Sequence, residues 1–142
     1  MSQGAVPVDP DETVLRRIPE IAGYYDPSKA PPVGVVAFRP TPDDTDGLSF
    51  YLEKETSAAE LIASGKPGKH YTVARMRAGD LYELGLHLIP DQQPGDLPGH
   101  LILPEGNLKT YNDPAQKHRV KEVCKNLSDL ANKGLIDPGK AD

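Results

Sequence analysis

The stretch DPAQKHRVKEVCKNLSDLANKG, residues 113–134, decides the fold class, because it is a long segment with a clear helical period. Asp113 followed by Pro114 is typical of a helix start, and Gly134 is typical of a helix end. Apolar residues recur at intervals of three and four, so that they share one helical face. These residues are Val120, Val123, Cys124, Leu127, Leu130 and Ala131. The stretch predicts a long C-terminal helix with one buried face.

The chain before this helix is predicted to be mainly strands. Residues 33–38 form a β-branched apolar run, which predicts a central strand buried on both faces. Turn residues at 41–47 precede an aromatic segment at 48–52 and predict a hairpin. Residues 13–18 fit either a strand or a helical turn, and we favour the strand. Further strands are predicted at 71–77 and 86–89.

Two short helices are predicted between the strands. Ser57 and Glu60 have the spacing of a capping box, and Gly65 is placed for a left-handed helix end. Asp80 can cap a second short turn that Gly85 terminates.

These elements predict an α+β fold. We expect a small antiparallel or mixed sheet of about four to five strands, with a short helix and the long C-terminal helix packed on one face. The 142 residues are enough for one domain. We place it at residues 13–136, with flexible tails at 1–12 and 137–142.

Composition excludes several classes of function. The net charge of −5 argues against general nucleic-acid binding. No apolar run approaches the roughly 18 residues of a membrane span, and the N-terminus lacks a signal-peptide core, so we expect a cytoplasmic protein. A lone cysteine, Cys124, cannot form an internal disulfide. Residues 109–133 hold six bases and three acids, which predicts a basic outer helix face.

Residues 90–112 are the most distinctive segment, with four prolines and three glycines. They predict an ordered loop around one short edge strand. Within it, a type II turn at Pro98 and Gly99 would present His100. Asp96, His100 and Glu105 are the candidate binding residues of this segment. His100 can act as a general base with one of these carboxylates orienting it, or it can hold the loop by bonding its backbone. We favour the second interpretation.

Other candidate residues are less specific. Arg39 follows the predicted strand at 33–38, and Arg75 lies within the predicted strand at 71–77. Each arginine can bind an anion bidentately, or it can pair with one of the acidic residues, which outnumber the basic ones. His70, His87 and His100 lack the close spacing of metal ligands. The sequence therefore predicts neither a metal site nor a cofactor.

Two phrases carry a resemblance: FRPTPDDTDGLSFY at residues 38–51 and PGDLPGHLILPE at residues 94–105. They resemble the FRP, GLS and PGH-loop motifs of small uncharacterised bacterial proteins. The resemblance implies a bacterial cytoplasmic origin and a genuine fold, and it transfers no catalytic residue.

Two functional hypotheses follow. The first is a small bacterial interaction or accessory protein of the immunity type, without catalytic activity, that binds a protein partner through residues 90–112. The alternative is a small hydrolase or nucleotide-processing enzyme, with His100 as base and Arg39 or Arg75 as anion clamp.

Overall fold

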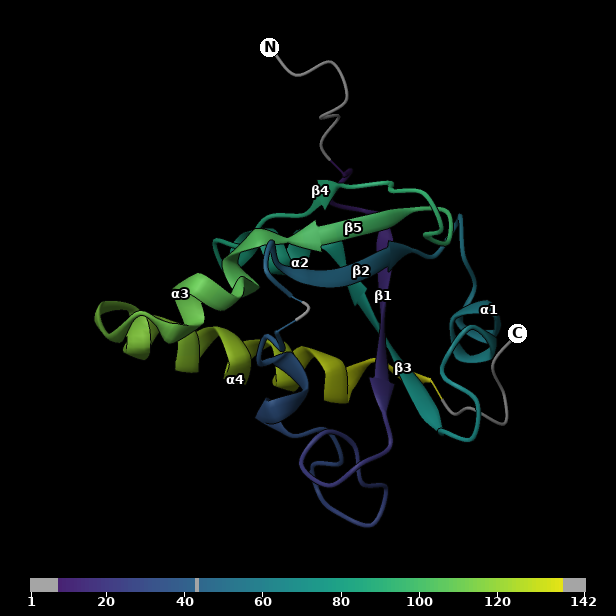
Figure 1. Cartoon of the computed structure of the whole chain (residues 1–142), viewed down its shortest axis with the longest axis horizontal. Helices are drawn as coiled ribbons and strands as arrows, with labels where there is room; N and C mark the ends of the chain where they lie inside the picture. Colours follow the sequence, from purple (N-terminus) through teal and green to yellow (C-terminus); the bar gives the residue numbers. More distant parts are fainter. Residues whose placement is uncertain (1–7, 43, 137–142) are drawn as a thin grey trace.

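A six-stranded antiparallel sheet forms the centre of the computed structural model, which describes residues 8–42 and 44–136 (Figure 1). The strand order is β4-β5-β2-β1-β3-β6. The strands are β1 (Thr13–Pro19), β2 (Leu48–Leu52), β3 (Tyr71–Arg77), β4 (Ile89–Pro90), β5 (His100–Leu103) and β6 (Leu135–Ile136). The α+β class is confirmed, but the sheet exceeds the predicted four to five strands. The strand with no counterpart in the sequence prediction is β6, whose two residues are too few to show an alternating pattern.

The central strand is β1, which confirms the strand interpretation of residues 13–18. It pairs with β3 along its whole length, from Thr13 opposite Arg77 to Pro19 opposite Tyr71. On its other side it pairs with β2, where Leu15 lies opposite Tyr51. β1 is therefore an interior strand with a hydrogen-bonded neighbour on each edge.

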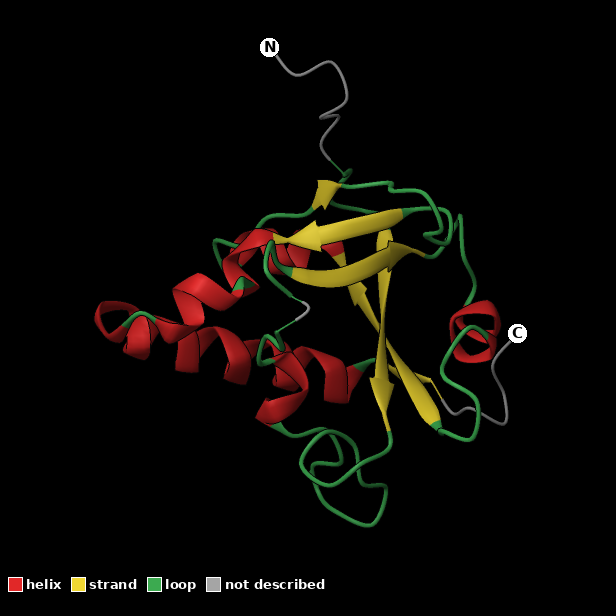
Figure 2. Cartoon of the chain, in the orientation of Figure 1, coloured by secondary structure: helices red, strands yellow, loops and turns green. Residues whose placement is uncertain are grey.

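Helices cover both faces of the sheet (Figure 2). The α-helices are α1 (Ala58–Ala63), α2 (Ala78–Glu83), α3 (Leu108–Asn112) and α4 (Lys117–Lys133). Three 3-10 helices are η1 (Val35–Phe38), η2 (Pro104–Gly106) and η3 (Pro114–Gln116). No helix in the described part of the chain has the length and apolar character needed to cross a membrane.

The larger core lies between the sheet, η1 and α4. From α4 it receives a buried stripe, which confirms the helical period of the sequence and the packing of this helix on one face. The stripe consists of Val120, Val123, Cys124, Leu127 and Ala131, with Leu130 only partly buried. On the opposite face, Ala58 and Leu61 of α1 pack against Leu15 and Val73.

The prediction of a central strand at residues 33–38 is wrong, because this segment forms the 3-10 helix η1. The start of this segment is held by an isolated bridge between Val33 and Tyr25 and by Asn132 of α4. The Asn132 side chain accepts a hydrogen bond from Val33 N at 2.8 Å and donates one to Val33 O at 3.0 Å. The apolar run therefore reflects burial of Ala37 and Phe38 beneath α4, not an extended conformation.

Three other strand predictions need correction. Without a strand at 33–38 there is no hairpin leading into β2, whose partners are β1 and β5. The predicted strand at 86–89 is reduced to Ile89–Pro90 of β4. The strand inside residues 90–112 is not an edge strand, because β5 lies between β4 and β2.

The helix ends agree with the sequence at some positions only. The capping box of α1 is confirmed: Glu60 N donates to Ser57 Oγ at 3.2 Å, and Ser57 N donates to Glu60 Oε1 at 3.0 Å. Gly85 has φ +79° and ends α2 as predicted. Asp80 does not cap α2, since it lies in the first turn and pairs with Arg77 at 3.1 Å.

Two further helix predictions are refined. Gly65 does not adopt the predicted left-handed conformation. Glycine is needed there because an added Cβ would lie 2.1 Å from the Tyr71 ring. Asp113 caps η3 by accepting from Ala115 N at 2.9 Å, and α4 follows from Lys117.

Residues 8–12 of the predicted N-terminal tail pack against α2. Val8 is buried, and its carbonyl accepts a 2.6 Å hydrogen bond from Tyr82 Oη. Gly79 N donates to Pro10 O at 2.8 Å. The packed chain therefore begins no later than Val8. Residues 1–7 of the predicted N-terminal tail and the tail predicted at 137–142 lie outside the described residues.

The capping box gives a direct stability prediction. Ser57→Ala should lower the free energy of unfolding by about 1 kcal/mol, because Glu60 N loses its acceptor. Urea denaturation measures the change. The exposed Thr45→Ala variant is the control and should stay within about 0.5 kcal/mol of wild type. Equal effects of the two substitutions would contradict the role of the cap.

Candidate functional site

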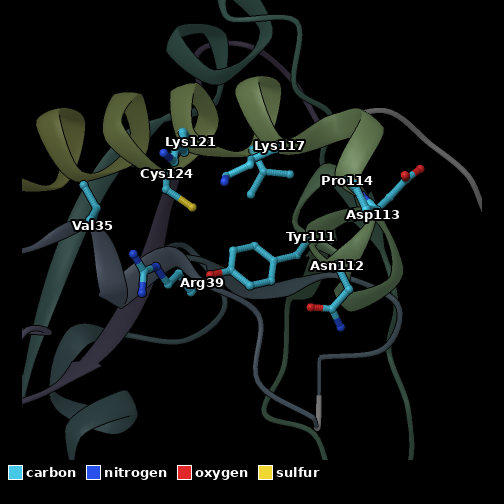
Figure 3. A pocket seen from close by; sticks show the side chains of 10 residues that line it. Val35, Arg39, Tyr111, Asn112, Asp113, Pro114, Lys117, Lys121 and Cys124 are labelled. Atoms are coloured by element: carbon cyan, nitrogen blue, oxygen red, sulfur yellow. The ribbon is translucent and has the colours of Figure 1, made fainter.

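A pocket opens where η1, α3 and η3 meet α4 (Figure 3). Its volume is about 600 Å³, within the range of small-molecule sites. The lining residues are Val35, Arg39, Tyr111, Asn112, Asp113, Pro114, Lys117, Val120, Lys121 and Cys124. The pocket is large enough for a small organic ligand.

Helical spacing on α4 builds one wall of this pocket. Lys117, Val120, Lys121 and Cys124 follow the spacing i, i+3, i+4 and i+7 and so occupy one stripe of the helix. Arg39, directly after η1, faces them across the pocket (Figure 3). The site thus combines three cationic side chains with an apolar wall that includes Val35, Val120 and the Tyr111 ring.

The side chains that line the pocket carry a net positive charge, whereas the whole protein has a net charge of −5. Arg39, Lys117 and Lys121 line it with one carboxylate, Asp113, whose Oδ1 is already bonded to Ala115 N. Burial raises the pKa of the Cys124 thiol, with nearby Arg39 acting in the opposite direction. The thiol is therefore protonated at neutral pH, and Sγ lies 3.4 Å from Phe38 O. The pocket carries net positive charge beside a neutral wall.

A second group of polar residues surrounds His100 on the sheet face that α1 partly covers. His100 is only 8% exposed. Its Nδ1 lies 2.6 Å from Asp91 O and 3.2 Å from Asp96 Oδ2, and its Nε2 lies 2.9 Å from Ser49 Oγ. The Tyr51 ring packs beside the imidazole, with ring centroids 5.2 Å apart.

The carbonyl of Asp91 assigns the tautomer of His100. A carbonyl oxygen only accepts hydrogen bonds, so Nδ1 must carry a proton and donate it. In the neutral ring, Nε2 then has a free lone pair and accepts from the Ser49 hydroxyl. His100 thereby ties the loop to β2 and β5, as the favoured interpretation of this residue expects.

The structure brings some predicted site residues together and separates others. Asp96 lies beside His100 as predicted, and Gly99 has the positive φ of the predicted turn, +80°. Glu105 is elsewhere: its carboxylate accepts from His87 N at 2.9 Å and lies 2.6 Å from His87 Nδ1. It is therefore bound to His87 rather than to His100.

The two arginines of the enzyme hypothesis also lie in other settings. Arg75 binds Glu53, with Nε 2.7 Å from Oε1. Arg39 lines the pocket beside η1 and α4, on the sheet face opposite to the His100 side chain. Ser49, which contacts His100, was not predicted, because it lies 51 residues away in the sequence.

A metal site at His100 requires a change of protonation. Among the described residues, Asp91, Asp96 and His100 have ligand atoms within 4.8 Å of one another. However, the Nδ1 that would bind the ion carries the proton donated to Asp91 O. We therefore assign hydrogen bonding, and no ion, to this group.

Comparison with known proteins gave no match to a family model, to a curated protein or to a solved structure. Function is therefore inferred from the pocket and from the group around His100.

Proposed function

We propose that this protein binds a small organic anion with an apolar body, such as a medium-chain carboxylate, in the pocket between η1 and α4. The observation that supports this is the placement of Arg39, Lys117 and Lys121 around an apolar wall in a protein of net charge −5. Positive potential in a concave site concentrates anionic ligands against the charge of the rest of the surface.

The ligand class follows from the two kinds of pocket surface. Guanidinium and ammonium groups form charge-assisted hydrogen bonds with a carboxylate, and arginine can do so bidentately. Val35, Val120 and the Tyr111 ring offer apolar surface to a hydrocarbon chain or ring. Val35 is 39% exposed, so a ligand can remove apolar surface from water there.

Ligand binding is compatible with the interaction or accessory role expected from the sequence. Tyr111 and Asn112 belong to residues 90–112, so a bound ligand would connect the end of this segment with η1 and α4. Occupancy of the pocket would then change the surface that the segment presents. Contact between a protein partner and residues 90–112 stays a prediction.

Calorimetry tests the proposed ligand class with a matched pair of compounds. Octanoate should bind at least about tenfold more tightly than octanol, because only the carboxylate pairs with the cations. Lys117→Gln should weaken octanoate binding by about tenfold.

Lys125→Gln is the matched control, because Lys125 lies on α4 but pairs with Asp129 at 3.0 Å and does not line the pocket. It should leave octanoate affinity unchanged. Equal affinity for octanol and octanoate, or equal effects of the two lysine variants, would overturn the proposal.

A further inference from the structure

We propose that Ser49, His100 and Asp96 form a nucleophilic group that hydrolyses small neutral carboxylic esters. Ser49 Oγ lies 2.9 Å from His100 Nε2, and Asp96 Oδ2 lies 3.2 Å from His100 Nδ1. Both distances fall in the range expected for a nucleophile, its base and the group that orients the base. This activity is separate from ligand binding in the pocket.

The proton positions suit nucleophilic attack. Nδ1 donates its proton to Asp91 O, and the Asp96 carboxylate lies 3.2 Å from Nδ1, so the lone pair of Nε2 accepts the Ser49 hydroxyl. Asp96 Oδ2 is itself held by a 3.0 Å hydrogen bond from Gln93 N. The imidazole is thereby fixed in the tautomer that can take the proton of Ser49, and partial exclusion of water strengthens these interactions.

Ser49 is on the sheet face that α1 covers in part. Helix α1 contacts β1 and β3, whereas Ser49 lies on β2 and is only partly buried. Ile102 of β5 lies opposite Ser49, and Ile89 of β4 lies opposite Ile102 and is 45% exposed. An apolar acyl group can therefore rest on Ile102 and Ile89, next to the reacting hydroxyl.

Charge around the group restricts the substrate class. Asp91 and Asp96 are both partly exposed beside His100. Two carboxylates repel an anionic substrate, so the geometry favours a neutral ester over a phosphate or carboxylate ester.

The reaction has two balanced steps. Ser49 Oγ attacks the ester carbonyl carbon while its proton moves to His100 Nε2. The tetrahedral adduct then collapses, the ester C–O bond breaks, and the departing alkoxide takes that proton, leaving acyl-Ser49. In the second step water gives a proton to Nε2 and attacks the acyl carbon. Release of the carboxylic acid then returns the proton to Ser49.

Acetylation by p-nitrophenyl acetate tests the proposal. Peptide mass spectrometry of the reacted, folded protein should locate an acetyl group on Ser49. Ser49→Ala should abolish it and lower p-nitrophenol release by about 100-fold or more, as expected for loss of an activated nucleophile. Ser28→Ala is the control, because Ser28 is an exposed turn residue bonded to Asp26. It should keep full activity.

Asp96→Asn tests the positioning role of the carboxylate. Acetylation of Ser49 should slow by about tenfold or more while thermal unfolding shows a folded protein. A purely structural His100 would give no Ser49 acetylation at all. Absence of acetyl-Ser49 in folded wild type, or unchanged turnover in Ser49→Ala, would overturn the proposal and would leave the octanoate result unaffected.

Discussion

Leu127→Ala should lower the free energy of unfolding by about 3 kcal/mol. Leu127 is fully buried, at 0% exposure, in the core between α4 and the sheet. Truncation removes apolar contacts and leaves a cavity that the packed strands cannot fill. Urea denaturation followed by circular dichroism measures the loss.

Lys125→Ala provides the control on the same helix. Lys125 lies on the exposed side of α4 and pairs with Asp129, so its removal should change stability by less than about 0.5 kcal/mol. If Leu127→Ala leaves stability unchanged, the buried position of α4 is contradicted, and its apolar stripe would instead be a docking face.

Gly134→Ala should destabilise the protein by about 3 kcal/mol through a steric clash. An added Cβ would lie 1.9 Å from Arg75 O, a backbone atom of β3. Arg75 N also donates to Gly134 O at 2.8 Å, so the two segments cannot separate without losing this hydrogen bond. Since Gly134 has φ −119°, the backbone conformation itself suits any residue. Thermal and urea unfolding measure the effect.

Gly68→Ala separates a clash from backbone strain. Gly68 has φ +78° with no atom within 4 Å of an added Cβ, so only the left-handed conformation opposes alanine. Its cost should be about 1 kcal/mol. A loss at Gly134 no larger than the loss at Gly68 would contradict the close approach of α4's end to β3.

The parts of the fold that sequence predicts are those specified by local patterns. The helical spacing of Val120, Val123 and Leu127 identifies α4, and the Ser57 to Glu60 spacing identifies the start of α1. The strand prediction for residues 33–38 is wrong because a β-branched apolar composition indicates burial but does not specify an extended conformation. The backbone N and O of Val33 bond to the side chain of Asn132, a residue 99 positions away in the sequence.

The candidate sites show the same division between local and long-range information. Asp96 and His100 are four residues apart, and their pairing is predicted. Ser49 reaches His100 only because β2 pairs with β5. The pocket likewise joins Arg39 to Lys117 and Lys121 through the packing of η1 against α4, a contact that no sequence period encodes.

Ligand binding in this pocket is tested most directly by a two-dimensional ¹⁵N NMR titration with octanoate. Binding at the proposed site predicts saturable shifts of the backbone amides of Val35, Arg39, Tyr111 and Lys121. At equal concentrations below octanoate saturation, octanol should shift these amides much less. Saturable octanoate shifts confined to other parts of the chain, or none at these four residues, would contradict the proposed function.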